Sequence, residues 1–315
     1  MKKIQLGTAP VQVCQMPLGA MWFGTTISPQ QAFSLTDLYR SCGGDFLDTA
    51  NNYSHWAGPQ YAGGESERVL GDYIQARRCR GDVFVATKMG FPKGGGKGAG
   101  LSAQTIRENI EISLRNLQTD YVDLLYMHCD DLTVAMQESF GAFDQLVREG
   151  KVRYIGVSNF MSYRLADALT FTSQNGWAVP CALQSRFSYY LPQDGRRMGN
   201  QRMLAPEHLH QCQTKNVLPV GYSVLLSGAY AMARGELPAG YQTQRNLARQ
   251  AALYDLAAQK GVLPGQLVLA WALEKGVSPL ISSSDASRLR ENMAAADIVL
   301  SSREMDLLDR AGALA

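Results

Sequence analysis

The chain has 315 residues, of which 46% are hydrophobic and 18% are charged. This composition is that of a globular protein with a large buried core, and it excludes an intrinsically disordered chain. The formal net charge of +2, from 30 basic and 28 acidic residues, is too small to indicate binding to nucleic acid or to an anionic membrane surface.

Cysteine spacing and hydropathy both indicate a cytoplasmic protein. The six cysteines form no C-x-x-C pair and no zinc-finger spacing, so we expect reduced thiols and no metal site built from them. The N-terminal stretch IQLGTAPVQV alternates instead of running apolar, and no segment approaches the roughly 18 apolar residues of a membrane span. We therefore expect neither a signal peptide nor a membrane partner.

The first predicted element is a β-hairpin at residues 4–13, where two short runs flank a Gly-Thr-Ala-Pro turn. Short apolar runs, typical of buried strands, then alternate with segments of helical spacing. The predicted strands are 16–23, 45–50, 83–88, 122–128, 152–159, 181–187, 217–224 and 277–283. The predicted helices include 28–41, 65–77, 102–117, 133–150 and 246–261.

This alternation predicts an α/β fold, the (β/α)8 or TIM barrel, because eight parallel strands joined by helices close on themselves. The hairpin would cap one end, and residues 302–312 would form an extra C-terminal helix. No break in composition divides the chain, so we expect one domain over residues 1–315. Two glycine-rich loops, 91–100 and 227–245, would lie at the C-terminal ends of the strands, where TIM-barrel active sites form.

Three polar residues recur at intervals of forty, each at the end of an apolar run: Asp48, Lys88 and His128. Tyr53 follows Asp48 by five residues. A lysine ammonium within reach would lower the pKa of a phenol from its ordinary value near 10, and Asp48 would keep that ammonium charged. A neutral imidazole could then donate a hydrogen bond to a carbonyl oxygen. The pattern predicts carbonyl reduction, with a structural ion pair and packing roles as the alternative.

The stretches FLDTANNY, ATK, DLLYMH and IGVSNF resemble the aldo-keto reductases, and the resemblance spans nearly the whole chain. It implies a (β/α)8 barrel that binds a nicotinamide dinucleotide without a Rossmann domain. It also implies that Asp48, Tyr53, Lys88 and His128 form the catalytic tetrad, with Tyr53 as the general acid in reduction.

The same resemblance implies the coenzyme contacts. Ser158, Asn159 and Gln184 would hydrogen-bond the carboxamide, although capping or backbone-satisfying roles are an alternative for these strand-end residues. Tyr222 would stack on the nicotinamide ring. The remaining residues expected to bind the dinucleotide are Ser223, Leu225, Ser227, Ser282, Ser283, Arg288 and Asn292.

The segment SSSDASRLREN resembles the part of the family that binds the adenosine phosphate, and Arg288 and Asn292 match its R-x-x-x-N spacing. A helix N-terminus and an arginine both favour a 2′-phosphate, so NADP is the expected coenzyme. Asp285 would repel that phosphate unless it caps the helix or binds a ribose hydroxyl. NAD therefore remains possible.

Four residues near strand ends or in the loop after Tyr53 are expected to contact substrate: Trp22, Trp56, Arg186 and Tyr190. Aromatic rings can bind the apolar face of a sugar or a polyketide, although such rings also serve packing. The short segment after the last helix predicts an open site for larger substrates.

The leading hypothesis is an NADP-dependent reductase that converts an aldehyde or ketone, on a sugar or a secondary metabolite, to an alcohol. The alternative is a nicotinamide-binding redox sensor or regulatory subunit with little turnover. A metal-dependent barrel enzyme using His128, Asp130 and Asp131 is a third reading, disfavoured because no second strand-end histidine accompanies His128. The expected partner is a small carbonyl compound, and no sequence feature predicts an oligomeric state.

Overall fold

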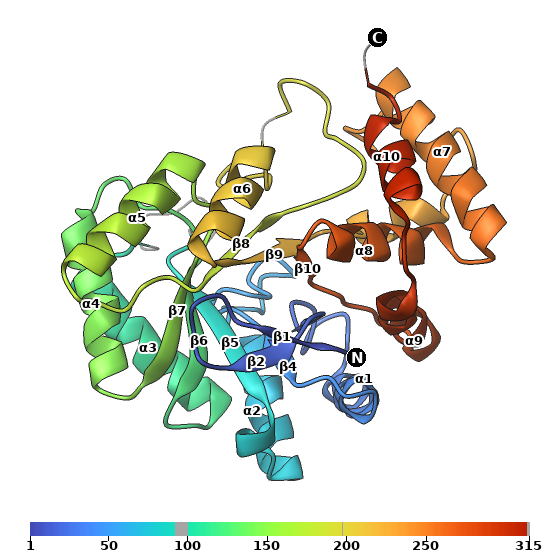
Figure 1. The fold of residues 1–315 in the computed structure, drawn as a ribbon. Coiled ribbons are helices and arrows are strands. Elements are labelled where there is room, and N and C mark those ends of the chain that lie inside the picture. Colours follow the sequence, from blue (N-terminus) through green and yellow to red (C-terminus); the bar gives the residue numbers. More distant parts are fainter. Residues whose placement is uncertain (92–99, 197, 314–315) are drawn as a thin grey trace.

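The computed structural model describes residues 1–91, 100–196 and 198–313 (Figure 1). Within these residues, parallel strands form one eight-stranded sheet in the order β3 to β10. Its two edges meet, because Leu18 and Ile281 form a parallel bridge and the Gly19 amide donates to the Ile281 carbonyl at 2.8 Å. The predicted (β/α)8 barrel is confirmed. Its strands are β3 (Leu18–Gly19), β4 (Phe46–Asp48), β5 (Phe84–Met89), β6 (Val122–Met127), β7 (Val152–Ser158), β8 (Ala182–Arg186), β9 (Leu218–Tyr222) and β10 (Ser278–Pro279).

The helices surround the sheet and follow its strands along the chain (Figure 1). Their bounds are α1 (Pro29–Ser41), α2 (Glu65–Arg77), α3 (Ala103–Leu117), α4 (Met136–Arg148), α5 (Ser162–Gln174), α6 (Pro206–Lys215), α7 (Gln244–Lys260), α8 (Pro264–Glu274), α9 (Ala286–Ala294) and α10 (Ser302–Arg310). The helices α5, α6 and α8 are not among those predicted from the sequence. Both α6 and α8 start with a proline, which the first helical position tolerates because its N–H has no intrahelical partner.

Side-chain caps decide where the predicted helices begin. Ser102 caps α3, with its hydroxyl accepting from the Thr105 amide at 3.2 Å. Thr243 caps α7 in the same way, so this helix starts two residues before its predicted start at residue 246. By contrast, α4 starts three residues later than predicted, because Asp131 holds the amide and hydroxyl of Thr133 in a turn.

The N-terminal hairpin pairs β1 (Lys3–Gln5) with β2 (Gln12–Cys14) in antiparallel register, as predicted. Cys14 donates its amide to Asp45, directly before β4, so the hairpin lies at the end of the barrel where the strands begin. At the other end of the chain, α10 packs on α7 through the Lys260–Glu304 ion pair at 2.7 Å.

The barrel interior is apolar toward the N-terminal ends of the strands and polar toward their C-terminal ends. Phe46 and Phe84 meet edge to face at 4.9 Å, and Tyr154 stacks on Phe84. Above them Tyr126 fills the space beside Gly156, and a Cβ at position 156 would lie 2.6 Å from its ring. The filled core thus leaves room for a site at the C-terminal ends of the strands.

The sequence predicted two loops at that end of the barrel. The glycine-rich loop at 91–100 falls mainly on residues 92–99, which lie outside the described residues. The segment at 227–245 begins within the short 3-10 helix η2 (Leu226–Ala231) and then continues irregularly to α7. Among the described helices, none has both the length and the apolar character needed to cross a lipid bilayer.

Candidate active site

A cavity of about 1270 Å³ opens at the C-terminal ends of the strands. Tyr53 and His128 line it near the barrel axis, and Arg288 and Asn292 line it at α9. Its walls therefore come from segments at both ends of the chain, which the closed barrel brings together.

The four residues predicted to form the tetrad meet beneath this cavity. Lys88 Nζ donates to Asp48 Oδ1, to the Thr49 carbonyl at 2.7 Å and to the Tyr53 hydroxyl at 3.0 Å. Asp48 and Lys88 are fully buried, whereas Tyr53 and His128 reach the cavity with their ring centroids 5.8 Å apart. The buried ion pair thus reaches the cavity through the Tyr53 phenol.

The charges of this cluster balance in favour of a protonated lysine. Burial lowers the pKa of Lys88, but the neighbouring Asp48 and Tyr53 raise it more, so the net pKa lies above its ordinary value. For Tyr53 the sequence-based expectation of a lowered pKa is wrong. Burial raises the pKa of the phenol, and the opposing effect of Lys88 is smaller than that of burial and Asp48 together.

His128 is neutral. Burial lowers its pKa well below the ordinary value, and the Lys88 charge lowers the pKa further. Its Nδ1 atom is buried and has no hydrogen-bond partner in the described part of the chain. Because an unsatisfied buried N–H is costly, the favoured tautomer carries the proton on Nε2. His128 can therefore donate a hydrogen bond from Nε2.

Gln184 lines the cavity, but its side chain serves the tetrad. Its amide donates to Asp48 Oδ2 at 2.8 Å, so the two carboxylate oxygens of Asp48 have separate donors. From the sequence, this amide was expected to bind the carboxamide of the coenzyme. The structure places it on Asp48, a residue 136 positions away in sequence.

Asn159 joins three strand ends. Its Nδ2 donates to the His128 carbonyl and the Ser158 hydroxyl, both at 3.0 Å. Its Oδ1 accepts from the Tyr222 hydroxyl at 2.8 Å and the Arg202 amide at 3.1 Å. All hydrogen-bonding positions of the amide are thus occupied by protein groups. Ser158 does not line the cavity, whereas Asn159 and Tyr222 do.

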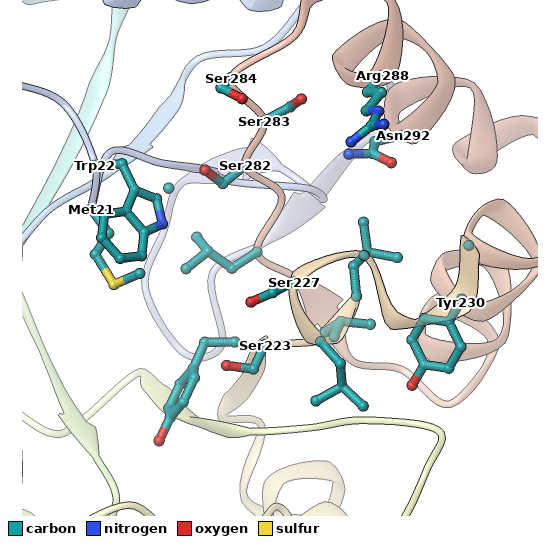
Figure 2. A pocket seen from close by; sticks show the side chains of 18 of the residues that line it. Met21, Trp22, Ser223, Ser227, Tyr230, Ser282, Ser283, Ser284, Arg288 and Asn292 are labelled. Carbon is teal, nitrogen blue, oxygen red and sulfur yellow. The ribbon is translucent and has the colours of Figure 1, made fainter. Parts of the chain in front are cut away.

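The remaining residues expected to bind the coenzyme all line the cavity: Ser223, Leu225, Ser227, Ser282, Ser283, Arg288 and Asn292. Figure 2 shows the serines at 282 to 284 on one wall, Arg288 and Asn292 beside them on α9, and Ser223 and Ser227 on the loop after β9. That loop holds Leu226, Ser227 and Gly228 at positive φ of 46°, 54° and 90°. Successive left-handed residues of this kind are found at ligand-binding turns.

Asp285 caps α9. Its Oδ1 accepts from the Arg288 amide at 2.8 Å, which is the capping role that the sequence allowed for this carboxylate. The negative charge therefore stays at the helix N-terminus, beside the guanidinium-bearing residue expected to bind phosphate.

Of the four residues expected to contact substrate, Trp22 and Trp56 line the cavity. Their rings meet edge to face at 6.4 Å, and Trp56 lies 5.8 Å from the Tyr53 ring. Tyr190 is fully buried and packs on Tyr230 at 4.6 Å, so its predicted contact with substrate is wrong. The chain after β8 turns inward, and the amide of Tyr190 donates to the Tyr230 hydroxyl.

Arg186 does not line the cavity either, although its side chain donates to Ser223 and Gln201, which do. Sequence reasoning missed several lining residues. Met21 adjoins Trp22 at a predicted strand end, a position that could have identified it. Asn52 and Glu291 lie within the stretches FLDTANNY and SSSDASRLREN, which could have marked them, and Phe91 starts the predicted glycine-rich loop. Ile27 and Gln201 lie where no motif marks them.

The two carboxylates that a metal-dependent barrel enzyme would use as ligands have structural partners. Asp130 pairs with Arg164 at 2.7 Å, and Asp131 accepts from the amides of Leu101 and Thr133. Within residues 1–91, 100–196 and 198–313, no group of three or more histidines, cysteines or acids is arranged to hold a metal ion. The hypothesis of a metal-dependent barrel enzyme therefore gains no support.

A family model described as the Aldo/keto reductase family matches residues 15–313, almost the entire chain. The chain belongs to the aldo/keto reductase family. It is 28% identical to norsolorinic acid reductase A of Aspergillus parasiticus over 96% of this chain and 80% of the relative. The aldo-keto reductase ausK of Aspergillus calidoustus is 30% identical, over 97% and 80%. An aryl-alcohol dehydrogenase of Pestalotiopsis microspora is 27% identical, over 96% and 80%. The protein is accordingly an oxidoreductase of this family.

Proposed function

We propose that this protein reduces an aldehyde or ketone to an alcohol with NADPH, and that Tyr53 is the general acid. The observation that carries the proposal is the position of Lys88 Nζ, which contacts Asp48 and the Tyr53 hydroxyl at once beneath the cavity. Such a cluster couples a buried charge to one hydroxyl at the surface where a substrate would bind.

The cavity suits a dinucleotide. Serine hydroxyls and the Arg288 guanidinium are donors of the kind that phosphate groups require, and the left-handed turn at Leu226 to Gly228 exposes backbone near them. Tyr222, fixed through its hydroxyl by Asn159, offers a ring on which a nicotinamide can stack. A reduced nicotinamide, when bound, supplies the hydride equivalent for carbonyl reduction.

The tetrad supplies the proton. Because burial raises the pKa of Tyr53, the phenol is protonated at neutral pH and ready to donate. Lys88 then stabilises the phenolate that remains, since its ammonium lies 3.0 Å from that oxygen and Asp48 keeps it charged. His128, neutral with its proton on Nε2, donates to the carbonyl oxygen and orients it toward Tyr53.

Arg288 favours NADP over NAD, because a guanidinium at a helix start recognises a 2′-phosphate by charge and by paired donors. Asp285 works against this preference, since its carboxylate occupies the same helix N-terminus. We therefore propose NADP as the principal coenzyme with NAD as a weaker one.

Trp22 and Trp56 favour a substrate with an extended apolar or aromatic surface. They form an edge-to-face aromatic wall that continues to the Tyr53 ring. The names of the relatives, norsolorinic acid reductase and aryl-alcohol dehydrogenase, suggest the same kind of substrate. An aromatic secondary-metabolite carbonyl is thus the better-supported substrate class than a sugar.

The test is NADPH oxidation with a panel of aromatic and aliphatic carbonyl compounds. Tyr53→Phe should lower kcat by about 10²–10⁴-fold and leave the dissociation constant for NADPH nearly unchanged. Tyr163→Phe, which removes the hydroxyl of an exposed tyrosine on α5, is the matched control. Turnover retained by Tyr53→Phe would refute the assignment, whereas NADPH binding without turnover of any carbonyl would favour the redox-sensor alternative.

A further inference from the structure

Arg186, the last residue of β8, holds its guanidinium among neutral groups. One terminal nitrogen donates to Gln201 Oε1 at 3.1 Å and to the Ser223 hydroxyl at 3.3 Å. The other donates to the Tyr241 hydroxyl at 3.0 Å. The Nε atom is buried and has no hydrogen-bond partner among the described residues. This cation is half-buried and incompletely satisfied.

Two other partly buried arginines of the chain have acidic partners, whereas the buried Arg249 donates to main-chain carbonyls. Arg80 pairs with Asp123 at 2.8 Å, and Arg164 pairs with Asp130 at 2.7 Å. In the part of the chain that the structure describes, no carboxylate oxygen lies within 4.0 Å of the Arg186 guanidinium. Because removing a charge from water is costly unless the charge is paired, this arrangement calls for an anion that the protein itself does not supply.

The surroundings of Arg186 are also positive. Arg202 lies on the adjacent segment, with its carbonyl accepting from the Arg186 amide at 2.8 Å, and its own guanidinium donates only to main-chain carbonyls. Arg196 stacks over the Tyr241 ring at 4.9 Å and likewise donates to a carbonyl. Within the described ranges, none of the three is paired with an acid.

The positive charges of Arg186 and Arg202 influence the pKa of Tyr222, which lines the cavity. Burial raises the pKa of the Tyr222 hydroxyl, and the charges of Arg186 and Arg202 both oppose that rise. Gln201 and Ser223, the neutral acceptors of Arg186, both line the cavity. An anionic group of a ligand can therefore approach Arg186 by displacing these two side chains.

We propose that Arg186 is an anion-binding residue at the edge of the cavity, where it takes an oxyanion of a bound ligand with Arg202 adding to the positive potential. Two sources supply such an oxyanion: an acidic group of the carbonyl substrate, or a phosphate of the coenzyme. The substrate source rests on the proposed carbonyl reduction. A guanidinium binds carboxylate and phosphate alike through paired N–H donors.

The experiment compares the native enzyme with Arg186→Gln, using benzaldehyde and 2-, 3- and 4-carboxybenzaldehyde as a neutral and anionic series. A charge-assisted hydrogen bond contributes about 1.5–3 kcal/mol, or about 10–100-fold in binding. If the substrate supplies the anion, Arg186→Gln raises KM by about this factor for at least one carboxybenzaldehyde and leaves KM for benzaldehyde nearly unchanged. If the coenzyme supplies it, the dissociation constant for NADPH rises instead, and all aldehydes respond alike.

Arg186→Lys should retain part of the effect, because it keeps the charge but not the paired donors. Arg107→Gln, at an exposed arginine on α3, controls for the change in net charge. Calorimetric titration with benzoate and with inorganic pyrophosphate requires no turnover, so it tests the anion site even if the enzyme reduces no aldehyde. Equal binding of both anions by native protein and Arg186→Gln, with an unchanged KM series, would show that Arg186 is only a structural brace.

Discussion

The side-chain amide of Gln184 donates to Oδ2 of Asp48 at 2.8 Å, while Lys88 donates to Oδ1 of the same carboxylate. Asp48 is fully buried, so these donors replace its lost hydration. Gln184 also lines the cavity. It therefore connects the charged cluster to the surface where ligands bind.

We predict that Gln184→Ala destabilises the protein by about 2–4 kcal/mol, because it leaves an oxygen of buried Asp48 without a donor and opens a cavity. Urea unfolding, followed by circular dichroism, measures this loss. Gln104→Ala, which removes an exposed amide bonded to Glu108, should change stability by about 0.5 kcal/mol or less. Equal stability of the two variants would contradict the role assigned to Gln184.

The buried ion pair of Lys88 and Asp48 leads to a second prediction. Lys88→Met should destabilise the fold by about 3–5 kcal/mol, because Asp48 is left charged and unpaired in the core. The double variant with Asp48→Asn should recover most of that loss, since neither member is then ionised. A double variant as unstable as the sum of its single variants would show that packing, and not charge, determines the loss.

The depressed pKa of His128 makes stability depend on pH in a definite direction. Below about pH 6.5, the ordinary pKa of histidine, the unfolded chain gains a proton that the folded His128 does not. Stability therefore falls as pH is lowered, by about 1.4 kcal/mol per pH unit for this group. Denaturant titrations between pH 4.5 and 7.5 should show that this component is missing in His128→Asn. Parallel pH profiles for the two proteins would exclude the buried, neutral histidine.

Gly156 on β7 provides a test of core packing. A Cβ there would lie 2.6 Å from the Tyr126 ring and 3.1 Å from the Ala182 carbonyl, so Gly156→Ala should destabilise by about 1–3 kcal/mol. Gly81→Ala is the control, because a Cβ at that position meets no atom within 4 Å. Thermal unfolding measures both. Tyr126→Leu should relieve part of the loss in the Gly156→Ala background.

Coenzyme preference is predicted to respond to Asp285. Asn is as good a helix cap as Asp, so Asp285→Asn should keep α9 intact while removing the negative charge beside Arg288. The ratio of kcat/KM for NADPH to that for NADH should rise by about tenfold, which corresponds to about 1.4 kcal/mol. Arg288→Leu should lower the same ratio. If neither variant changes it, the 2′-phosphate is not bound at the N-terminus of α9.

Much of the barrel was predictable because its signals are local. Apolar runs predicted the parallel strands, and Asp48, Lys88 and His128 stood out because each closes such a run. Since parallel strands end on one side of a barrel, their proximity followed from position alone. The helices at α6 and α8 were missed because a leading proline and weak amphipathic spacing obscured them.

Sequence by itself determined the eight strand segments, the end of the barrel that holds the site and the identity of the four central side chains, because periodicity and strand-end position encode these features. Only the tertiary structure decided what the neighbouring polar groups do. It turned Gln184 toward Asp48, saturated Asn159 with protein partners, buried Tyr190 and, among the described residues, gave Arg186 no acidic partner. Burial, too, reversed the expected pKa of Tyr53. The physical reason is that hydrogen-bond partners and desolvation depend on residues far apart in the chain, which no local pattern records.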